Sequence, residues 1–294
     1  MKTYELPDGK NDYGYLDIDT GYDYKAGKVI ASTMSRNREE NGQPIPGCLV
    51  KVVYDLDTIS QIQLTVEPGA SSPTSGFVAH DGCEEISLVM AGKGKLELPG
   101  GESLELKTDI SFYLKPGQPH RIVNDSKEVL KVMVFYSSTL ANVPRTLAAD
   151  DTAENLPDGF CVKDINEGVQ NLAPGFTWDR PDDGHFTSII FEGDNICFLF
   201  PIQMPNVSSP EIDFVSHPGV HELEFALSGG GTVIMPDKVY RLRPGIMRYN
   251  PPEQPSKSWN NTTEPLRLAV FYSTGRLANV SRTHKHARIF EILN

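Results

Sequence analysis

The first half of the chain holds histidine and glutamate residues at a spacing that could support chemistry. His80 is followed by four residues and then by Glu85, and six further residues lead to Gly92. Further along, the run Pro116-Gly117-Gln118-Pro119-His120 ends in a second histidine. Imidazole and carboxylate groups bind first-row transition metals, so a metal site is one hypothesis for these residues. The alternative is that the histidines are hydrogen-bonded structural residues of a core or a rim.

The second half of the chain is a copy of the first. Residues 134–146 read VFYSSTLANVPRT, and residues 270–283 read VFYSTGRLANVSRT. Elsewhere an ungapped alignment places His217 on His80, Glu222 on Glu85 and Gly229 on Gly92. The length of 294 residues is also about what two domains require. The sequence therefore predicts an internal duplication.

Each copy is composed of short segments typical of strands. Residues 59–69, 84–106 and 111–117 are rich in β-forming residues, partly in alternation, and are broken by Gly and Pro. No long helical periodicity is present. Such spacing predicts an all-β sandwich or barrel, and a jelly roll is among the architectures that fit. The acidic, turn-rich segment from about Ala148 to Asp158 is the expected linker between the copies.

Together these patterns resemble the motifs of the cupin superfamily. The first family motif has the form HxH, three or four residues, E, six residues, G. The second has the form PxG, two residues, H, three residues, N, which Gly117 to Asn124 match, with Pro116 directly before Gly117. The resemblance covers both halves, so the chain is identified as a bicupin with two tandem cupin (jelly-roll β-barrel) domains. We expect these domains to span residues 1–150 and 151–294.

The resemblance implies a metal site in the amino-terminal domain, with His80, Glu85 and His120 as ligands. Val78 holds the position of the first histidine of the HxH motif, so three ligands are expected. Two imidazoles and one carboxylate suit one divalent transition metal such as Fe, Mn, Zn or Ni, and they leave coordination positions open. Cys83 lies between His80 and Glu85 and is either an additional thiolate ligand or a loop thiol.

The second copy departs from this pattern. His217 and Glu222 match the first two ligands, but Ser256 stands where the first copy has His120. Because a hydroxyl is a poor ligand for first-row metals, we expect the carboxyl-terminal domain to lack a complete metal site. Glu224 adds a second carboxylate on the same strand face as Glu222. His217, Glu222 and Glu224 are therefore either a candidate second cation site or a vestigial polar cluster.

Composition and charge exclude other classes of protein. The chain has 27 Lys and Arg against 39 Asp and Glu, for a formal net charge of −12, and no basic stripe that would bind nucleic acid. The longest apolar run, 196–202, is too short to cross a bilayer. No signal peptide is visible, and the 4 cysteines are scattered without paired spacing. We therefore expect a cytoplasmic protein with no nucleic-acid or membrane partner.

The function that we expect is that of a metal-dependent bicupin enzyme acting on a small oxygenated organic molecule. Dioxygenase, isomerase or lyase, and hydrolase chemistry all occur in the superfamily, and we favour the dioxygenase slightly. One alternative is a non-catalytic bicupin that binds a sugar or an organic acid. The other is a structural, storage-type bicupin. The expected partners are a small-molecule substrate and, as an option, further copies of the chain in a homo-oligomer.

Overall fold

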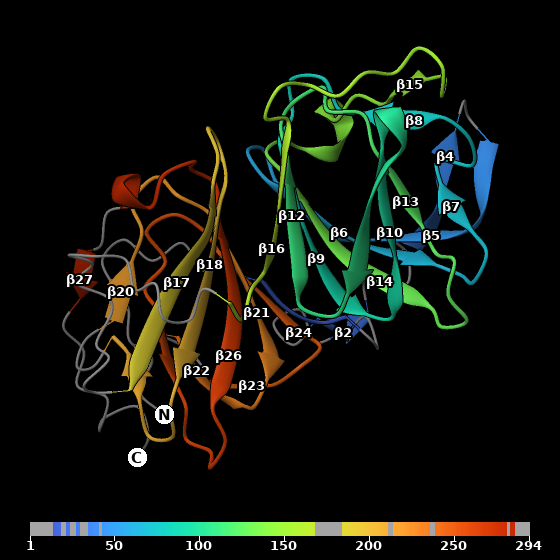
Figure 1. Cartoon of the computed structure of the whole chain (residues 1–294). Coiled ribbons are helices and arrows are strands. Elements are labelled where there is room, and N and C mark those ends of the chain that lie inside the picture. The colour runs from blue at the N-terminus through green and yellow to red at the C-terminus, as the bar shows by residue number, and fades with distance from the viewer. Residues whose placement is uncertain are drawn as a thin grey trace. The chain divides into compact units, whose positions relative to one another are not determined.

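The computed structural model describes residues 14–18, 22–23, 28–29, 35–40, 43–167, 184–210, 214–235, 239–280 and 283–285. The chain folds into two compact units (Figure 1). Residues 30–167 form the first unit, and residues 1–29 together with 168–294 form the second unit. Both consist almost entirely of strands, as the sequence predicts. None of the helices in the described residues has the length and apolar character needed to span a membrane.

The first unit contains a large and a small sheet, with one further strand pair. The large sheet has the order β16-β12-β9-β14-β6-β5-β4, the small sheet β11-β10-β13-β7, and β15 pairs with β8. The strands are β4 (Ser35–Glu40), β5 (Gln43–Asp55), β6 (Ser60–Val66), β7 (Ser71–Ser72), β8 (Phe77–Ala79), β9 (Glu85–Ala91), β10 (Lys93–Leu98), β11 (Glu102–Lys107), β12 (Ile110–Leu114), β13 (Arg121–Val123), β14 (Leu130–Tyr136), β15 (Thr146–Ala148) and β16 (Phe160–Asp164). Two short 3-10 turns, η2 (Pro99–Gly101) and η3 (Leu140–Asn142), connect them.

The second unit repeats this plan. Its large sheet has the order β17-β18-β26-β21-β24-β1-β2-β3, its small sheet β19-β25-β22-β23, and β20 pairs with β27. The strands are β1 (Gly14–Asp17), β2 (Tyr22–Asp23), β3 (Lys28–Val29), β17 (His185–Glu192), β18 (Cys197–Gln203), β19 (Ser208–Ser209), β20 (Phe214–Ser216), β21 (Glu222–Ser228), β22 (Gly231–Ile234), β23 (Val239–Leu242), β24 (Ile246–Asn250), β25 (Lys257–Trp259), β26 (Leu266–Tyr272) and β27 (Thr283–Lys285). A 3-10 turn, η5 (Leu277–Asn279), follows β26.

The internal duplication is visible in matching strands and turns. The order β16-β12-β9-β14-β6-β5 in the first unit corresponds to β1-β24-β21-β26-β18-β17 in the second. Gly92 and Gly229, which end the first motif of each copy, both have positive φ, at 81° and 76°. A Cβ atom at either position would lie 2.2 Å from a backbone carbonyl oxygen, that of Val129 or Pro265. Glycine is therefore required at both turns.

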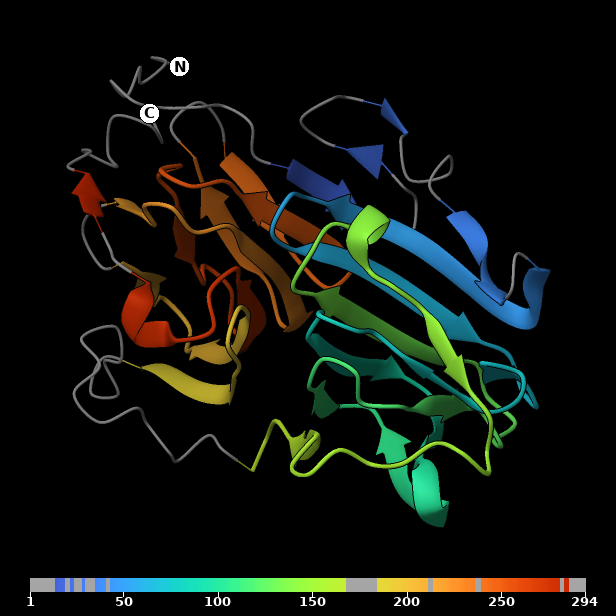
Figure 2. The same ribbon diagram turned by 90° about the horizontal axis from the view of Figure 1, so that it is seen from above.

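The two units exchange their leading strands. β1 precedes the first repeat in the sequence but pairs with β24 of the second unit, and Figure 2 shows this blue segment beside orange strands. β16 precedes the second repeat but pairs with β12 of the first unit. The exchange is symmetrical in detail, because Ile18 N donates to Gly245 O at 2.9 Å and Ile165 N donates to Asp109 O at 3.0 Å. The large sheet of each unit is thus completed by the strand that precedes the other repeat in the sequence.

This exchange makes the compact units differ from the expected domains 1–150 and 151–294. Main-chain hydrogen bonds of β16 hold the chain on the first unit up to residue 167. The expected linker at 148–158 also packs there, because Leu156 N donates to Gln118 Oε1 at 3.1 Å. A boundary placed at the acidic segment therefore precedes the end of the first unit.

Candidate metal centre and its counterpart

Main-chain hydrogen bonds bring the motif residues of the first unit together. Val78 and His120 exchange two bonds, N to O in each direction, both of 2.9 Å. Gly117 N donates to His80 O at 3.0 Å, which holds the loop before β13 against the end of β8. Glu85 is the first residue of β9. The ends of three strands therefore position the three motif side chains.

These side chains form one compact cluster. Glu85 Oε2 lies 3.5 Å from His80 Nε2 and 3.6 Å from His120 Nε2. All three residues are buried, with 4%, 2% and 1% of the surface of His80, Glu85 and His120 exposed. Their ligand atoms all lie within 4.8 Å of one another, and among the described residues this is the one cluster with such geometry. A single ion could contact all three groups.

Hydrogen bonds around the cluster orient lone pairs toward its centre. His80 Nδ1 lies 2.7 Å from Pro144 O, and His120 Nδ1 lies 3.2 Å from Gln118 O. A carbonyl oxygen only accepts, so both Nδ1 atoms carry a proton, and in the neutral rings both Nε2 atoms face Glu85 as acceptors. Ser87 Oγ donates to Glu85 Oε1 at 2.8 Å, which leaves Oε2 toward the rings. Three acceptors in a buried space repel one another unless a cation lies between them, and this donor set fits a divalent transition metal.

Neighbouring side chains restrict the ligand set to these three. Val78 is fully buried, at 0% exposure, and supplies no ligand atom. The Cys83 thiol does not belong to the cluster that His80, Glu85 and His120 form. The Cys83 thiol is also directed elsewhere, since it donates to Glu84 O at 3.4 Å.

In the second unit, the residues that match the first two ligands contact a tyrosine. Tyr272 Oη donates to Glu222 Oε1 at 3.1 Å and lies 3.5 Å from His217 Nε2. Ser256, in the place of the third ligand, accepts a hydrogen bond of 2.8 Å from Asn250 Nδ2. The same amide donates to Glu222 Oε2 at 2.9 Å. Hydrogen-bond donors therefore surround the carboxylate that corresponds to Glu85.

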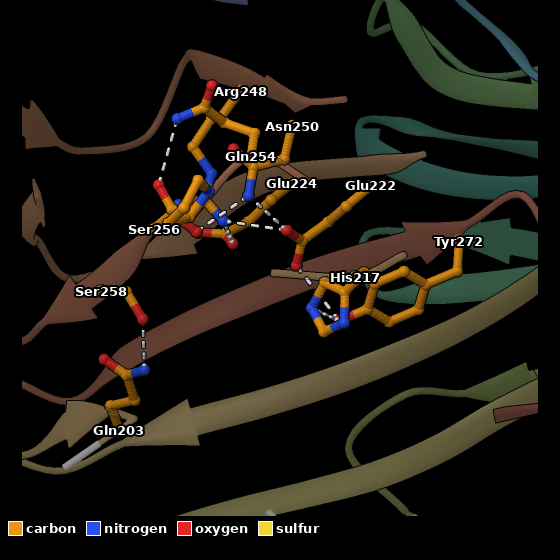
Figure 3. Close-up of polar contacts among 11 residues, drawn as sticks. Gln203, His217, Glu222, Glu224, Arg248, Asn250, Gln254, Ser256, Ser258 and Tyr272 are labelled. Carbon is orange, nitrogen blue, oxygen red and sulfur yellow. Dashed lines mark hydrogen bonds and ion pairs between the residues drawn. The ribbon is translucent and has the colours of Figure 1, made fainter. Parts of the chain in front are cut away.

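A buried arginine completes this cluster. Arg248 Nη2 donates to Glu222 Oε2 at 3.3 Å and to Glu224 Oε2 at 2.5 Å. Only 3% of the surface of Arg248 is exposed. Figure 3 shows Arg248, Asn250 and both glutamates gathered on one side of the group, with His217 and Tyr272 on the other. The guanidinium lies beside both carboxylates, where a cation bound by Glu222 and Glu224 would have to lie.

The two glutamates titrate in opposite directions. Burial opposes ionisation of Glu222, but Arg248, His217 and the hydrogen bonds from Asn250 and Tyr272 together hold its pKa below the usual value. Burial raises the pKa of Glu224 to about 7 in spite of Arg248, and repulsion from Glu222 adds to the increase. One guanidinium thus stabilises one carboxylate fully and the second only in part.

The structure therefore does not assemble His217, Glu222 and Glu224 as a metal cluster, because the arginine already supplies the positive charge. Sequence reasoning missed Arg248. The repeat contained a usable signal, since the alignment of Tyr249 on Tyr113 places Arg248 on Phe112. A charged residue at a position that is apolar in the other copy indicates a changed interior.

The cluster lies in a pocket of the second unit. The pocket is small and partly open to solvent, with a cavity volume of about 60 Å³. Besides the cluster, polar side chains from β17, β18 and β25 line it, including His185, Thr187, Gln203 and Ser258. Leu199, Val215, Leu268 and Val270 form apolar parts of the wall. Its mixed polar and apolar lining is typical of a small-molecule site.

Comparison with known proteins identifies the fold. A family model described as a cupin domain matches residues 63–136, which include His80, Glu85 and His120. No curated protein matches the chain. A variant of oxalate decarboxylase from Bacillus subtilis is similar in structure, with a TM-score of 0.57, 13% identity, and coverage of 87% of this chain and 78% of that chain.

A second oxalate decarboxylase structure, from work on its substrate binding mode and a switch of its reaction specificity, gives a TM-score of 0.58 at 14% identity. It covers the same shares of the two chains, 87% and 78%. At these identities the likeness concerns the fold. The expectation of tandem jelly-roll domains is confirmed.

Proposed function

Since this chain is a member of the cupin superfamily, we propose that its first unit is a metal-dependent enzyme that acts on a small oxygenated organic molecule. The observation that carries the proposal is the convergence of two buried imidazole Nε2 atoms on Glu85 Oε2, at 3.5 and 3.6 Å. The proteins of similar fold are named for oxalate, a small acid with adjacent oxygens. A ligand of that kind fits a site with three protein ligands.

The residues of this chain hold and shield the site. His80 and His120 supply nitrogen ligands, and Glu85 supplies one carboxylate oxygen that offsets part of the charge of a dication. When bound, a divalent metal supplies a Lewis acid that two oxygens of a substrate can chelate. The carbonyl groups behind the two rings fix the tautomers, which keeps both Nε2 atoms available.

Within the superfamily's reactions, we favour oxygen-dependent cleavage over hydrolysis. A bound metal ion can activate water for hydrolysis, and an acid or base beside the ligands commonly assists by moving the proton. Tyr136 lies edge-on to His80, with ring centroids 5.1 Å apart, but three other interior positions, those of Phe112, Leu114 and Ile122, are apolar and belong to the hydrophobic core of the first unit. These side chains exclude water from the neighbourhood of the ligands and provide no group for proton transfer.

Metal analysis tests the site. We expect anaerobically purified protein to carry about one equivalent of a first-row transition metal. The variant His120→Ala should lower metal affinity by more than about tenfold, because even outer-shell changes have effects of that size. Ser256→Ala, at the matching position of the second unit, is the control and should leave the metal content unchanged. Stoichiometric metal in folded His120→Ala would show that the site is elsewhere.

Turnover assays separate an enzyme from a binding protein. Catechol, acetylacetone and oxalate each present two oxygens to a metal, as a diol, an enolate and a diacid. Oxygen uptake with the first two, or carbon dioxide release from oxalate, should be lost in His120→Ala. If none of the three is turned over by metal-loaded protein, the non-catalytic bicupin is the better description.

A further inference from the structure

The interior of the second unit is polar at positions where that of the first unit is apolar. Strand registers and the repeat alignment give the correspondence. The apolar core residues of the first unit are Val50, Val66, Phe112 and Ile122. Their counterparts, which all line the pocket, are Thr187, Gln203, Arg248 and Ser258. A barrel that had only lost a metal ligand would have no physical reason to bury these polar groups, because burial without partners is unfavourable.

The polar groups of the pocket have hydrogen-bonding capacity to spare. Gln203 Nε2 donates to Ser258 Oγ at 2.7 Å, while within the described residues Gln203 Oε1 is buried without a hydrogen-bond partner. Glu224 Oε1 is in the same situation. Ser256 and Ser258 each accept a bond from an amide, so both hydroxyl protons remain available for donation. The pocket thus offers acceptors and donors side by side.

The single guanidinium of the pocket compensates one of its two carboxylates, and burial keeps the pKa of the other, Glu224, raised to about 7. Arg248 is held by both Glu222 and Glu224 through its Nη2 atom (Figure 3). An anionic ligand would meet two carboxylates, and a cationic ligand would meet the guanidinium. A neutral ligand avoids both penalties. Hydroxyl groups both donate and accept, so a molecule with several of them matches this mixture of groups, while its C–H faces match Leu199 and Val270.

We propose that the second unit binds a small neutral polyhydroxylated molecule in this pocket and without a metal ion. The guanidinium of Arg248 lies where a metal ion would lie and holds the two glutamates in place through hydrogen bonds. Gln203, Ser256 and Ser258 contact the ligand hydroxyls. The site is independent of the metal centre proposed for the first unit.

The test uses three sugars that share a ring and differ in charge. Binding of D-glucose, D-glucuronate and protonated D-glucosamine to the full chain is measured by calorimetry and ligand-observed NMR. We expect D-glucose to bind and the two charged sugars to bind at least about tenfold more weakly. Absence of glucose binding at millimolar concentration, or tighter binding of either charged sugar, would overturn the proposal.

Restoring the residues of the first unit provides the matched variant. The double substitution Gln203→Val and Ser258→Ile removes both partners of one hydrogen bond, so it leaves no buried group unpaired. It should weaken glucose binding by about tenfold or more without lowering the melting temperature. Thr187→Val serves as a second, nearly isosteric variant, and it should also weaken glucose binding. Unchanged glucose affinity in both folded variants contradicts the assignment.

Treatment with EDTA distinguishes this proposal from the one for the first unit. Chelation should remove the metal and any turnover but leave glucose affinity unchanged. Loss of glucose binding on chelation would refute a metal-free site even if the metal centre of the first unit were established.

Discussion

The buried carboxylate of Glu224 should limit the stability of the second unit at neutral pH. It is 4% exposed and shares one guanidinium with Glu222. Glu224→Gln retains the size of the side chain and an oxygen that accepts from Arg248, and it removes the charge. We predict that this variant is more stable than the parent chain, and that the difference grows with pH.

The magnitude follows from the pKa of Glu224, which burial raises from 4.5 to about 7. Each pKa unit corresponds to about 1.4 kcal/mol, so this rise in pKa corresponds to a change of about 3 kcal/mol in the free energy of unfolding. The folded state keeps a proton that the unfolded chain releases above pH 4.5. This stability is fully present below the unfolded pKa and is lost as the pH rises through the folded pKa. The glutamine side chain of the variant does not titrate. The free energy of unfolding of the variant therefore exceeds that of the parent by near zero at about pH 4.5 and by about 3 kcal/mol at about pH 8.

Tryptophan fluorescence isolates the relevant unit. Both tryptophans of the chain, Trp178 and Trp259, lie in the sequence range of the second unit. Urea unfolding of parent and variant is compared at each pH, so contributions from all other titrating groups cancel in the difference. If Glu224→Gln is less stable than the parent at high pH, the carboxylate is ionised and its pairing with Arg248 outweighs its burial, and the reasoning fails.

Two further predictions concern the duplication. Ser256→His alone should bind no additional metal, because the guanidinium remains between the carboxylates. Addition of Arg248→Phe and Glu224→Ser, the residues of the first unit, should raise the metal content by about one equivalent in elemental analysis, and no gain in a folded triple variant would contradict this. Gly92→Ala should destabilise the first unit by more than about 2 kcal/mol, since its Cβ would lie 2.2 Å from a carbonyl oxygen. Gly82→Ala has a similar φ of 71° with nothing within 4 Å, so its cost by thermal unfolding should be nearer 1 kcal/mol, and equal costs would refute the role of the contact.

The motifs were sufficient to find the cluster in the first unit. The spacing from His80 to Glu85 spans one turn between β8 and β9, and the second motif adds His120 through a two-bond bridge to Val78. Such local turns depend on glycine and proline positions that a sequence displays directly. The geometry of this cluster therefore follows from short-range features.

The exchange of strands could not be predicted in this way. β1 and β16 are short, and the only clear likeness between them is the pair Asp17-Ile18 against Asp164-Ile165. Which sheet edge each strand joins depends on long-range pairing with β24 or β12. A sequence divided at its most linker-like segment therefore places the boundary before the strand that completes the first unit.

Arg248 shows how the second barrel accommodates the loss of a ligand. With Ser256 in place of the third ligand, a buried Glu222 beside His217 still needs a positive charge, since an unpaired buried carboxylate is strongly unfavourable. An arginine on the adjacent strand meets that need permanently, and Asn250 and Tyr272 satisfy the remaining lone pairs. Unlike a metal ion, the guanidinium cannot be removed by a chelator. It also has no coordination positions at which a substrate could bind. The pocket around this charge remains, and its lining favours hydrogen bonding over Lewis-acid chemistry.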